Sequence, residues 1–161
     1  MGRMFISSLA LVIVAGAGWA QSDNRSVLGQ SNELLSAGAI AIRAGRYDDG
    51  IRLTMLGLDR EPATPFERAA ALANLCAAHA AKGEPDVAIE FCDQSISINA
   101  RNWRAYSNRS YAYFLKGLYS EAALDIDAAA AIAPQARQVQ QIRGMINERS
   151  LLPRVRMEDH Q

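Results

Sequence analysis

The sequence predicts an all-α protein built as a stack of helical hairpins. A glycine that separates two amphipathic segments occurs three times, at Gly45, Gly83 and Gly117, which lie 38 and 34 residues apart. Small residues recur seven positions before each glycine and five and twelve positions after it, as Gly38, Cys76 and Ser110, then Gly50, Ala88 and Ala122, then Gly57, Ser95 and Ala129. A period near 34 made of paired helices is typical of a helical solenoid.

The apolar spacing within each copy predicts where the helices lie. Helices are expected over 31–44, 47–60, 65–82, 85–98, 102–116, 119–132 and 135–149. Four extra residues separate the first two copies, and they include Thr64, Pro65 and Glu67. Thr followed three residues later by Glu is a capping box, with Pro at the first helical position. The last helix carries Val139, Ile142, Met145 and Ile146 on one face, as expected of a helix that caps the final repeat.

The chain resembles the tetratricopeptide-repeat family. The third copy, 103–136, carries the resemblance best, with residues of the expected kind at Tyr106, Ser110, Tyr113, Gly117, Tyr119, Ala122, Ile126, Ala129 and Pro134. The family usually has Leu and Gly where this copy has Arg109 and Ser110, and the second copy has Pro85 where an aromatic residue is usual. The resemblance implies a right-handed solenoid of three repeats, over about 31–64, 69–102 and 103–136, with a capping helix over 135–149.

The first twenty residues have the pattern of a secretory signal peptide. Arg3 precedes a short apolar run that ends in small residues at Gly18 and Ala20. The run is shorter than the roughly 20 residues that a membrane-spanning helix needs, so cleavage after Ala20 is favoured over an uncleaved anchor. We therefore expect an exported, periplasmic or secreted bacterial protein: a signal peptide over 1–20, a lead-in over 21–30, the repeat domain over 31–149 and a flexible tail over 150–161.

Composition and motifs argue against catalysis. Lys and Arg number 17 and Asp and Glu number 17, so the net charge gives no preference for nucleic acid. No zinc-protease motif or phosphate loop occurs, and His79 lies among alanines, as a packing residue does. The acids at Asp48, Asp49, Asp86, Glu90, Asp125 and Asp127 are expected at helix starts or on exposed faces. We expect no enzyme, no cofactor and no metal.

In this family the first helices of the repeats form a concave groove for a peptide or a partner helix. The resemblance places Ser36, Ala39, Arg43, Asn74, Ala77, Ala81, Arg104, Ser107, Asn108, Tyr111 and Leu115 on that side. Of these, we expect the peptide contacts at Asn74, Arg104, Ser107, Asn108 and Tyr111. An Asn amide can pair with a peptide backbone and an Arg can bind a carboxylate in a bidentate way. Asn74 and Asn108 lie 34 residues apart, and each is alternatively a tolerated polar residue on a solvated face.

The two cysteines are placed symmetrically about a turn. Cys76 and Cys92 each lie eight residues from Glu84, so the two face each other at the same height of an antiparallel hairpin. Packed helices can bring inward-facing Cα atoms within the range of a disulfide, and an exported protein can keep one. The alternative is two buried thiols that only pack.

Together these features predict a non-catalytic protein-interaction module of the bacterial cell envelope. The partner is a protein or peptide of unknown identity, and no membrane span is expected in the mature chain. A structural protein of the envelope that associates with itself as a homodimer is the alternative.

Overall fold

The computed structural model describes residues 32–60 and 62–151, all of whose regular structure is helical. Its seven helices are α1 (Glu33–Arg43), α2 (Tyr47–Arg60), α3 (Pro65–Ala81), α4 (Pro85–Ile98), α5 (Trp103–Leu115), α6 (Tyr119–Ile132) and α7 (Arg137–Leu151). Each begins and ends within two residues of the helix that the sequence predicts. The expected signal peptide, the lead-in and residues 152–161 of the expected tail lie outside the described residues.

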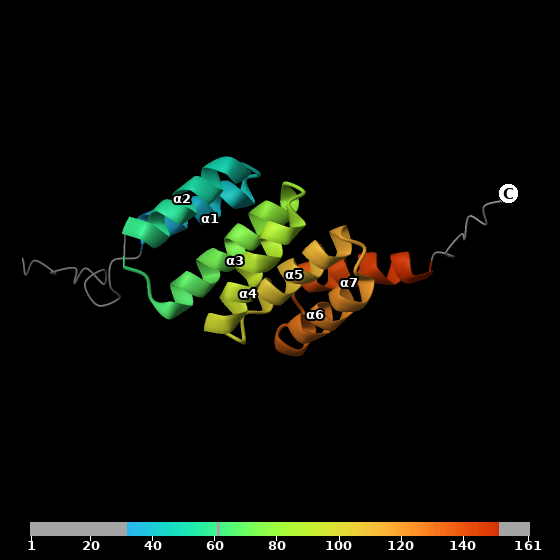
Figure 1. Ribbon diagram of the computed structural model, residues 1–161. Helices are drawn as coiled ribbons and strands as arrows, with labels where there is room; N and C mark the ends of the chain where they lie inside the picture. Colours follow the sequence, from blue (N-terminus) through green and yellow to red (C-terminus); the bar gives the residue numbers. More distant parts are fainter. Residues whose placement is uncertain (1–31, 61, 152–161) are drawn as a thin grey trace, which may run out of the picture. The chain divides into compact units, whose positions relative to one another are not determined.

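The helices pair in chain order. Contacts join α1 to α2, α3 to α4 and α5 to α6, and we call these pairs hairpins 1, 2 and 3 (Figure 1). Each hairpin also contacts the next, and α7 lies against α5 and α6. The fold is therefore an all-α stack of helical hairpins, as the sequence predicts.

The three repeated glycines make the turns within the hairpins. Gly45, Gly83 and Gly117 have φ values of 75°, 79° and 75°, a left-handed conformation that only glycine adopts readily. In each turn the N–H after the glycine donates to the carbonyl five residues earlier, from Arg46 to Ala41, Glu84 to His79 and Leu118 to Tyr113, each at 2.9 Å. These bonds satisfy carbonyls at the end of the first helix. The repeated glycine of the sequence therefore corresponds to the same turn, with the same hydrogen bond, in each hairpin.

The repeated small residues lie where the two helices of a hairpin approach closely. A Cβ added to Gly38 would lie 2.3 Å from Oγ1 of Thr54, and one added to Gly50 would lie 2.4 Å from Cγ1 of Ile42. In the other two hairpins, Cys76, Ala88, Ser95, Ser110, Ala122 and Ala129 occupy the equivalent positions and are fully buried. The inner face of each hairpin therefore tolerates only small side chains at these places.

The buried apolar residues form two clusters. The first contains Ala73, Cys76, Ala80, Ala88, Cys92, Ala105 and Ala112, from hairpins 2 and 3. The second contains Ala122, Ile126, Ala129, Val139, Ile142 and Ile146, from hairpin 3 and α7. Because α7 supplies half of the second cluster, it caps hairpin 3 as the sequence predicts.

Candidate functional site

Two of the five expected peptide contacts are free on the side formed by the first helices. Arg104, near the start of α5, is exposed, and its guanidinium lies 4.4 Å from the ring centroid of Trp103. No ion pair engages Arg104 among the residues that the structure describes. Asn74 in α3 is half-buried, and no described residue hydrogen-bonds its side-chain amide. Both side chains are therefore available to a ligand, one as a cation and one as a donor and acceptor.

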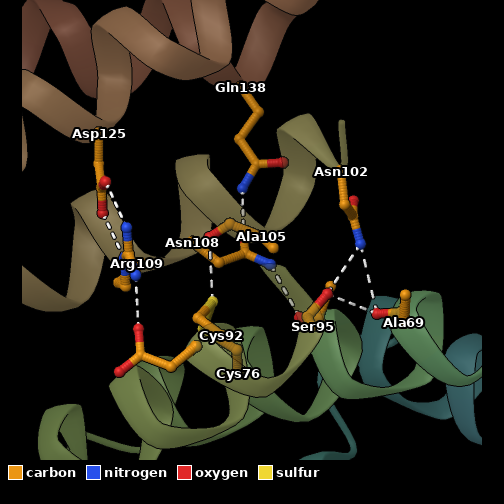
Figure 2. Close-up of a disulfide and its surroundings, with 12 residues drawn as sticks. Ala69, Cys76, Cys92, Ser95, Asn102, Ala105, Asn108, Arg109, Asp125 and Gln138 are labelled. Atoms are coloured by element: carbon orange, nitrogen blue, oxygen red, sulfur yellow. Dashed lines mark hydrogen bonds and ion pairs between the residues drawn. A yellow bond between two sulfur atoms is a disulfide. The ribbon is translucent and has the colours of Figure 1, made fainter. Parts of the chain in front are cut away.

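Asn108 is not available, which corrects the expectation from the sequence. Its side chain is 7% exposed, and its amide nitrogen donates to the carbonyl of Ala73 at 2.8 Å. Its amide oxygen accepts a hydrogen bond of 2.6 Å from Nε2 of Gln138 in α7 (Figure 2). The amide therefore ties α3, α5 and α7 together instead of facing a partner.

Ser107 is also wrong as a peptide contact. Its side chain is fully buried in α5, and its hydroxyl has no hydrogen-bond partner among the described residues. Tyr111 is only partly accessible to a ligand, since its half-buried ring packs against both apolar clusters. We therefore keep Asn74, Arg104 and Tyr111 as candidate contacts and define them as the first-helix face, together with the exposed residues Ser36, Arg43 and Leu115.

Arg109, the departure from the usual repeat, forms an ion-pair network. Its Nε and Nη2 donate to the two carboxylate oxygens of Asp125 in α6, at 2.7 and 2.8 Å. Its Nη1 donates to Asp93 in α4 at 2.5 Å, and the rings of Tyr106 and Tyr113 flank the guanidinium. The hydrogen bonds that Arg109 donates to Asp125, together with the one to Asp93, hold the pKa of Arg109 above its usual range. This pairing removes the charge of Arg109 from the first-helix face.

The structure also corrects the expectation for Asp125. The sequence analysis expects this acid at a helix start or on an exposed face, but Asp125 is only 7% exposed and pairs with Arg109. The pairing explains how a carboxylate is accommodated inside hairpin 3. The only signal in the sequence was that Arg109 breaks the apolar pattern sixteen residues before an Asp.

His79 has a packing role, as the sequence suggests. Its ring stacks on Phe91 with centroids 5.3 Å apart, and its Nδ1 lies 2.6 Å from a carboxylate oxygen of Glu84. This hydrogen bond from His79 holds the pKa of Glu84 below its usual range. The pair closes the turn between α3 and α4. No group of three His, Cys, Asp or Glu side chains within 32–60 and 62–151 is arranged to hold a metal ion.

Cys76 and Cys92 face each other across hairpin 2. Their Cα atoms lie 5.4 Å apart and the structure joins their sulfurs (Figure 2). Both residues are fully buried, and the Cys92 sulfur lies 3.0 Å from the carbonyl oxygen of Ala105 in the next hairpin. Gly38 faces Thr54 at the equivalent place of hairpin 1, so the repeat itself creates this close approach. The positions therefore fit a disulfide, whose formation in the exported protein stays a prediction.

Comparison with known proteins identifies the fold. No model of a known protein family matches the chain. The DnaJ homolog subfamily C member 3 of Gallus gallus is 28% identical over 110 residues, which are 68% of this chain and 22% of that protein. Its counterpart from Rattus norvegicus is 27% identical over 130 residues, 80% of this chain and 25% of that protein. The chain therefore corresponds to about a quarter of these curated relatives.

Solved tetratricopeptide-repeat (TPR) domains have the same fold. The first TPR of RPAP3, bound to the HSP90 peptide SRMEEVD, has a TM-score of 0.62 and 23% identity, covering 73% of this chain and 90% of that one. The TPR domain of Sgt2 from Aspergillus fumigatus has a TM-score of 0.63 and 20% identity, covering 80% and 89%. The second TPR domain of human RPAP3, in complex with the HSP70 peptide SGPTIEEVD, has a TM-score of 0.60 and 21% identity, covering 71% and 92%. The described residues thus have a TPR fold.

Proposed function

We propose that this TPR-like chain is a protein-interaction module that binds an extended acidic peptide on its first-helix face. The observation that carries the proposal is the pair of free polar groups there, the Arg104 guanidinium and the Asn74 amide. An Arg binds carboxylates in a bidentate way, and an Asn amide pairs with a peptide backbone. The proposal contains no catalytic step.

The distribution of charge supports an acidic ligand. The second helices α4 and α6 contain acids and no Lys or Arg, whereas α5 contains Arg104 and Arg109 and no acid. Because Arg109 is occupied by Asp93 and Asp125, Arg104 is the cation of α5 that is left for a partner. The peptides bound by the RPAP3 domains, SRMEEVD and SGPTIEEVD, are of this chemical kind.

We also propose that the module acts in the bacterial cell envelope after export. The apolar run and the small residues that end at Ala20 support this placement. Within the described residues, no helix combines the length and apolar character required to cross a bilayer. No described feature favours the alternative of self-association, and light scattering over a range of protein concentrations tests it.

Fluorescence anisotropy with two labelled probes tests the peptide proposal. The probes are SRMEEVD and the charge-reversed peptide SRMKKVD, titrated with the mature protein at low salt. We expect SRMEEVD to bind more tightly, and Arg104→Ala to weaken its binding about tenfold, since a charged hydrogen bond is worth about 1.5 kcal/mol or more. Asn74→Ala should weaken it about fivefold.

The matched control is Arg52→Ala, which removes an exposed Arg from the second helix of hairpin 1. It should leave the affinity unchanged. If Arg104→Ala and Arg52→Ala weaken peptide binding equally, the affinity depends on the overall charge of the protein and not on a defined binding site. Failure of both probes to bind at millimolar protein would refute the acidic-peptide proposal.

A further inference from the structure

The polar contacts between successive hairpins follow a repeated register. Acids on a second helix pair with bases on the next first helix: Asp48 with Lys82 at 2.7 Å, Asp86 with Lys116, Asp93 with Arg109 at 2.5 Å and Asp127 with Arg143 at 2.5 Å. Asp86 and Asp93 lie seven residues apart, as do Lys116 and Arg109, so α4 and α5 share two rungs separated by two helical turns. We call this set of pairs the junction ladder.

The ladder is incomplete between hairpins 1 and 2. The rung at Asp48 and Lys82 is present, but the positions of the second rung, seven residues after Asp48 and seven before Lys82, hold Met55 and Leu75. The Asp48 side chain is 86% exposed, so this single pair is the kind of ion pair that contributes little to stability. Among the described residues, the other polar contact across this junction is a long, exposed hydrogen bond of 3.5 Å from Arg68 to the carbonyl of Leu58.

The junction between hairpins 2 and 3 is much more strongly connected. Besides two rungs of the ladder, buried Asn108 donates to Ala73, and Asn102 donates to Ala69 at 3.3 Å and to Ser95 at 2.9 Å. The first apolar cluster contains residues of both hairpins, including both cysteines. Removing one element here would leave buried polar groups without partners.

Hairpin 1 contributes no residue to either apolar cluster within the described part of the chain. Within hairpin 1, Leu35, Ala41 and Thr54 are buried beside the glycines, Asn32 donates to the carbonyl of Gly57 at 2.9 Å, and there is no disulfide. On the other side of the junction, α3 presents Ala71, Leu75 and Ala78, which are buried at a spacing of three and four residues and belong to neither cluster. One repeat later the equivalent residues Ala105, Arg109 and Ala112 contact hairpin 2, and α1 and α2 both contact α3, so the repeat register assigns this stripe of α3 to the contact with hairpin 1.

We propose that hairpin 1, residues 32–60, is a separate cooperative unit that opens from α3 while hairpins 2 and 3 and α7 stay folded. Regions that open below the global unfolding free energy are those with few buried contacts to the rest. Opening uncovers Ala71, Leu75 and Ala78, which makes this stripe an apolar surface present in a minor state of the molecule. The inference stands on the junction contacts and does not depend on the proposed peptide site.

Hydrogen exchange measured by mass spectrometry on the full mature protein, in increasing sub-denaturing urea, tests the proposal. We expect the slowest amides of 32–60 to exchange about tenfold or more faster than those of 65–132, with a weaker dependence on urea. Asp48→Asn should accelerate exchange in 32–60 a further two- to fivefold, the range for an exposed ion pair, and leave 65–132 unchanged.

The matched control is Asp86→Asn, which removes the equivalent rung between hairpins 2 and 3. Because Asn102, Asn108 and Arg109 still join these hairpins, exchange in 65–132 should not accelerate measurably. Equal exchange rates and equal urea dependence in 32–60 and 65–132 would overturn the proposal. Equal effects of Asp48→Asn and Asp86→Asn, each in its own hairpins, would also overturn it, because the two junctions would then be equally strong.

Discussion

Arg109 shows how a single residue can leave the apolar pattern of a repeat and still pack. In the second repeat the same position holds Leu75, which is fully buried. Arg109 replaces that apolar contact by hydrogen bonds to Asp125 within hairpin 3 and to Asp93 on hairpin 2. The replacement is stable only if the charge stays compensated, since an unpaired charge in a partly buried site is costly.

Asp125→Asn should therefore destabilise the protein by about 3 kcal/mol, the lower end for breaking a buried ion pair, because the Arg109 side chain keeps some exposure and still faces Asp93. Asp93→Asn is the matched control, since this acid is 54% exposed and should cost no more than about 1 kcal/mol. Urea unfolding followed by circular dichroism measures both values. Equal losses in the two variants would contradict the view that Asp125 is the main partner of Arg109.

Asn108 and Ser107 show why the candidate site was only partly predictable at the residue scale. Asn108 lies 34 residues after Asn74, so the repeat register places both on the same face. The register cannot show that Gln138 of α7 donates to the Asn108 amide oxygen, or that the Asn108 amide nitrogen donates to the carbonyl of Ala73. These contacts join helices that are distant in the sequence, and only the packed structure brings them together. Arg104 and Asn74 have side chains that no described residue pairs with, and their role as peptide contacts stays a prediction.

At the scale of elements, the sequence predicted most of the fold because the turns within the hairpins and the start of α3 have local causes. The turns follow from glycine at Gly45, Gly83 and Gly117, and the start of α3 follows from Thr64 and Pro65. The end of α7 has no such signal, and this helix continues to Leu151, two residues beyond the predicted end. Arg143 pairs with Asp127 at the same separation of sixteen residues as Arg109 with Asp93, so α7 packs as the first helix of a further repeat would.

Removal of the cap of α3 should have a measurable cost. The Thr64 hydroxyl accepts from the N–H of Glu67 at 3.2 Å, and the Glu67 carboxylate accepts from the N–H of Thr64 at 2.9 Å. Thr64→Ala should therefore lower the unfolding free energy by about 1 kcal/mol, measured by urea unfolding. Thr64→Ser, which keeps the hydroxyl, is the control and should stay close to the parent protein.

The same cap should depend on pH. The Glu67 carboxylate accepts hydrogen bonds from the backbone N–H of Thr64, which has the larger effect, and from the Thr64 hydroxyl. Both bonds lower the pKa of Glu67 in the folded protein. A carboxyl whose folded pKa lies below its unfolded value contributes stability above the unfolded pKa and loses it as pH falls through the folded pKa. The stability difference between the parent and Glu67→Gln should therefore shrink from neutral pH to pH 3. A difference independent of pH would contradict an ionised Glu67 in the cap.

At the scale of the whole molecule, the processing prediction concerns residues that precede the hairpins. The apolar run before Ala20 is too short for a spanning helix and ends in small residues, so we expect the exported protein to begin at Gln21. Intact mass spectrometry of the protein recovered from the envelope of an expressing bacterium measures this directly. A mass that still includes Met1 to Ala20 would show that the segment is retained as an anchor.

The predicted disulfide also acts at the scale of the whole molecule, because a disulfide restricts the unfolded chain. Cys76 and Cys92 are sixteen residues apart, and closing a loop of this size stabilises a folded protein by about 3 kcal/mol in the chain-entropy model. We therefore expect the double variant Cys76→Ala, Cys92→Ala to unfold at a temperature about 10 °C below that of the exported parent. Alanine also removes the packed sulfur atoms, so a control is needed that breaks only the bond. For this control the parent protein is unfolded, reduced and refolded in reductant, and its unfolding temperature is measured in the same way. The reduced parent should lose most of the same stability. Thiol titration of the exported protein, unfolded without reductant, should find no free thiol, and two free thiols would show that the cysteines only pack.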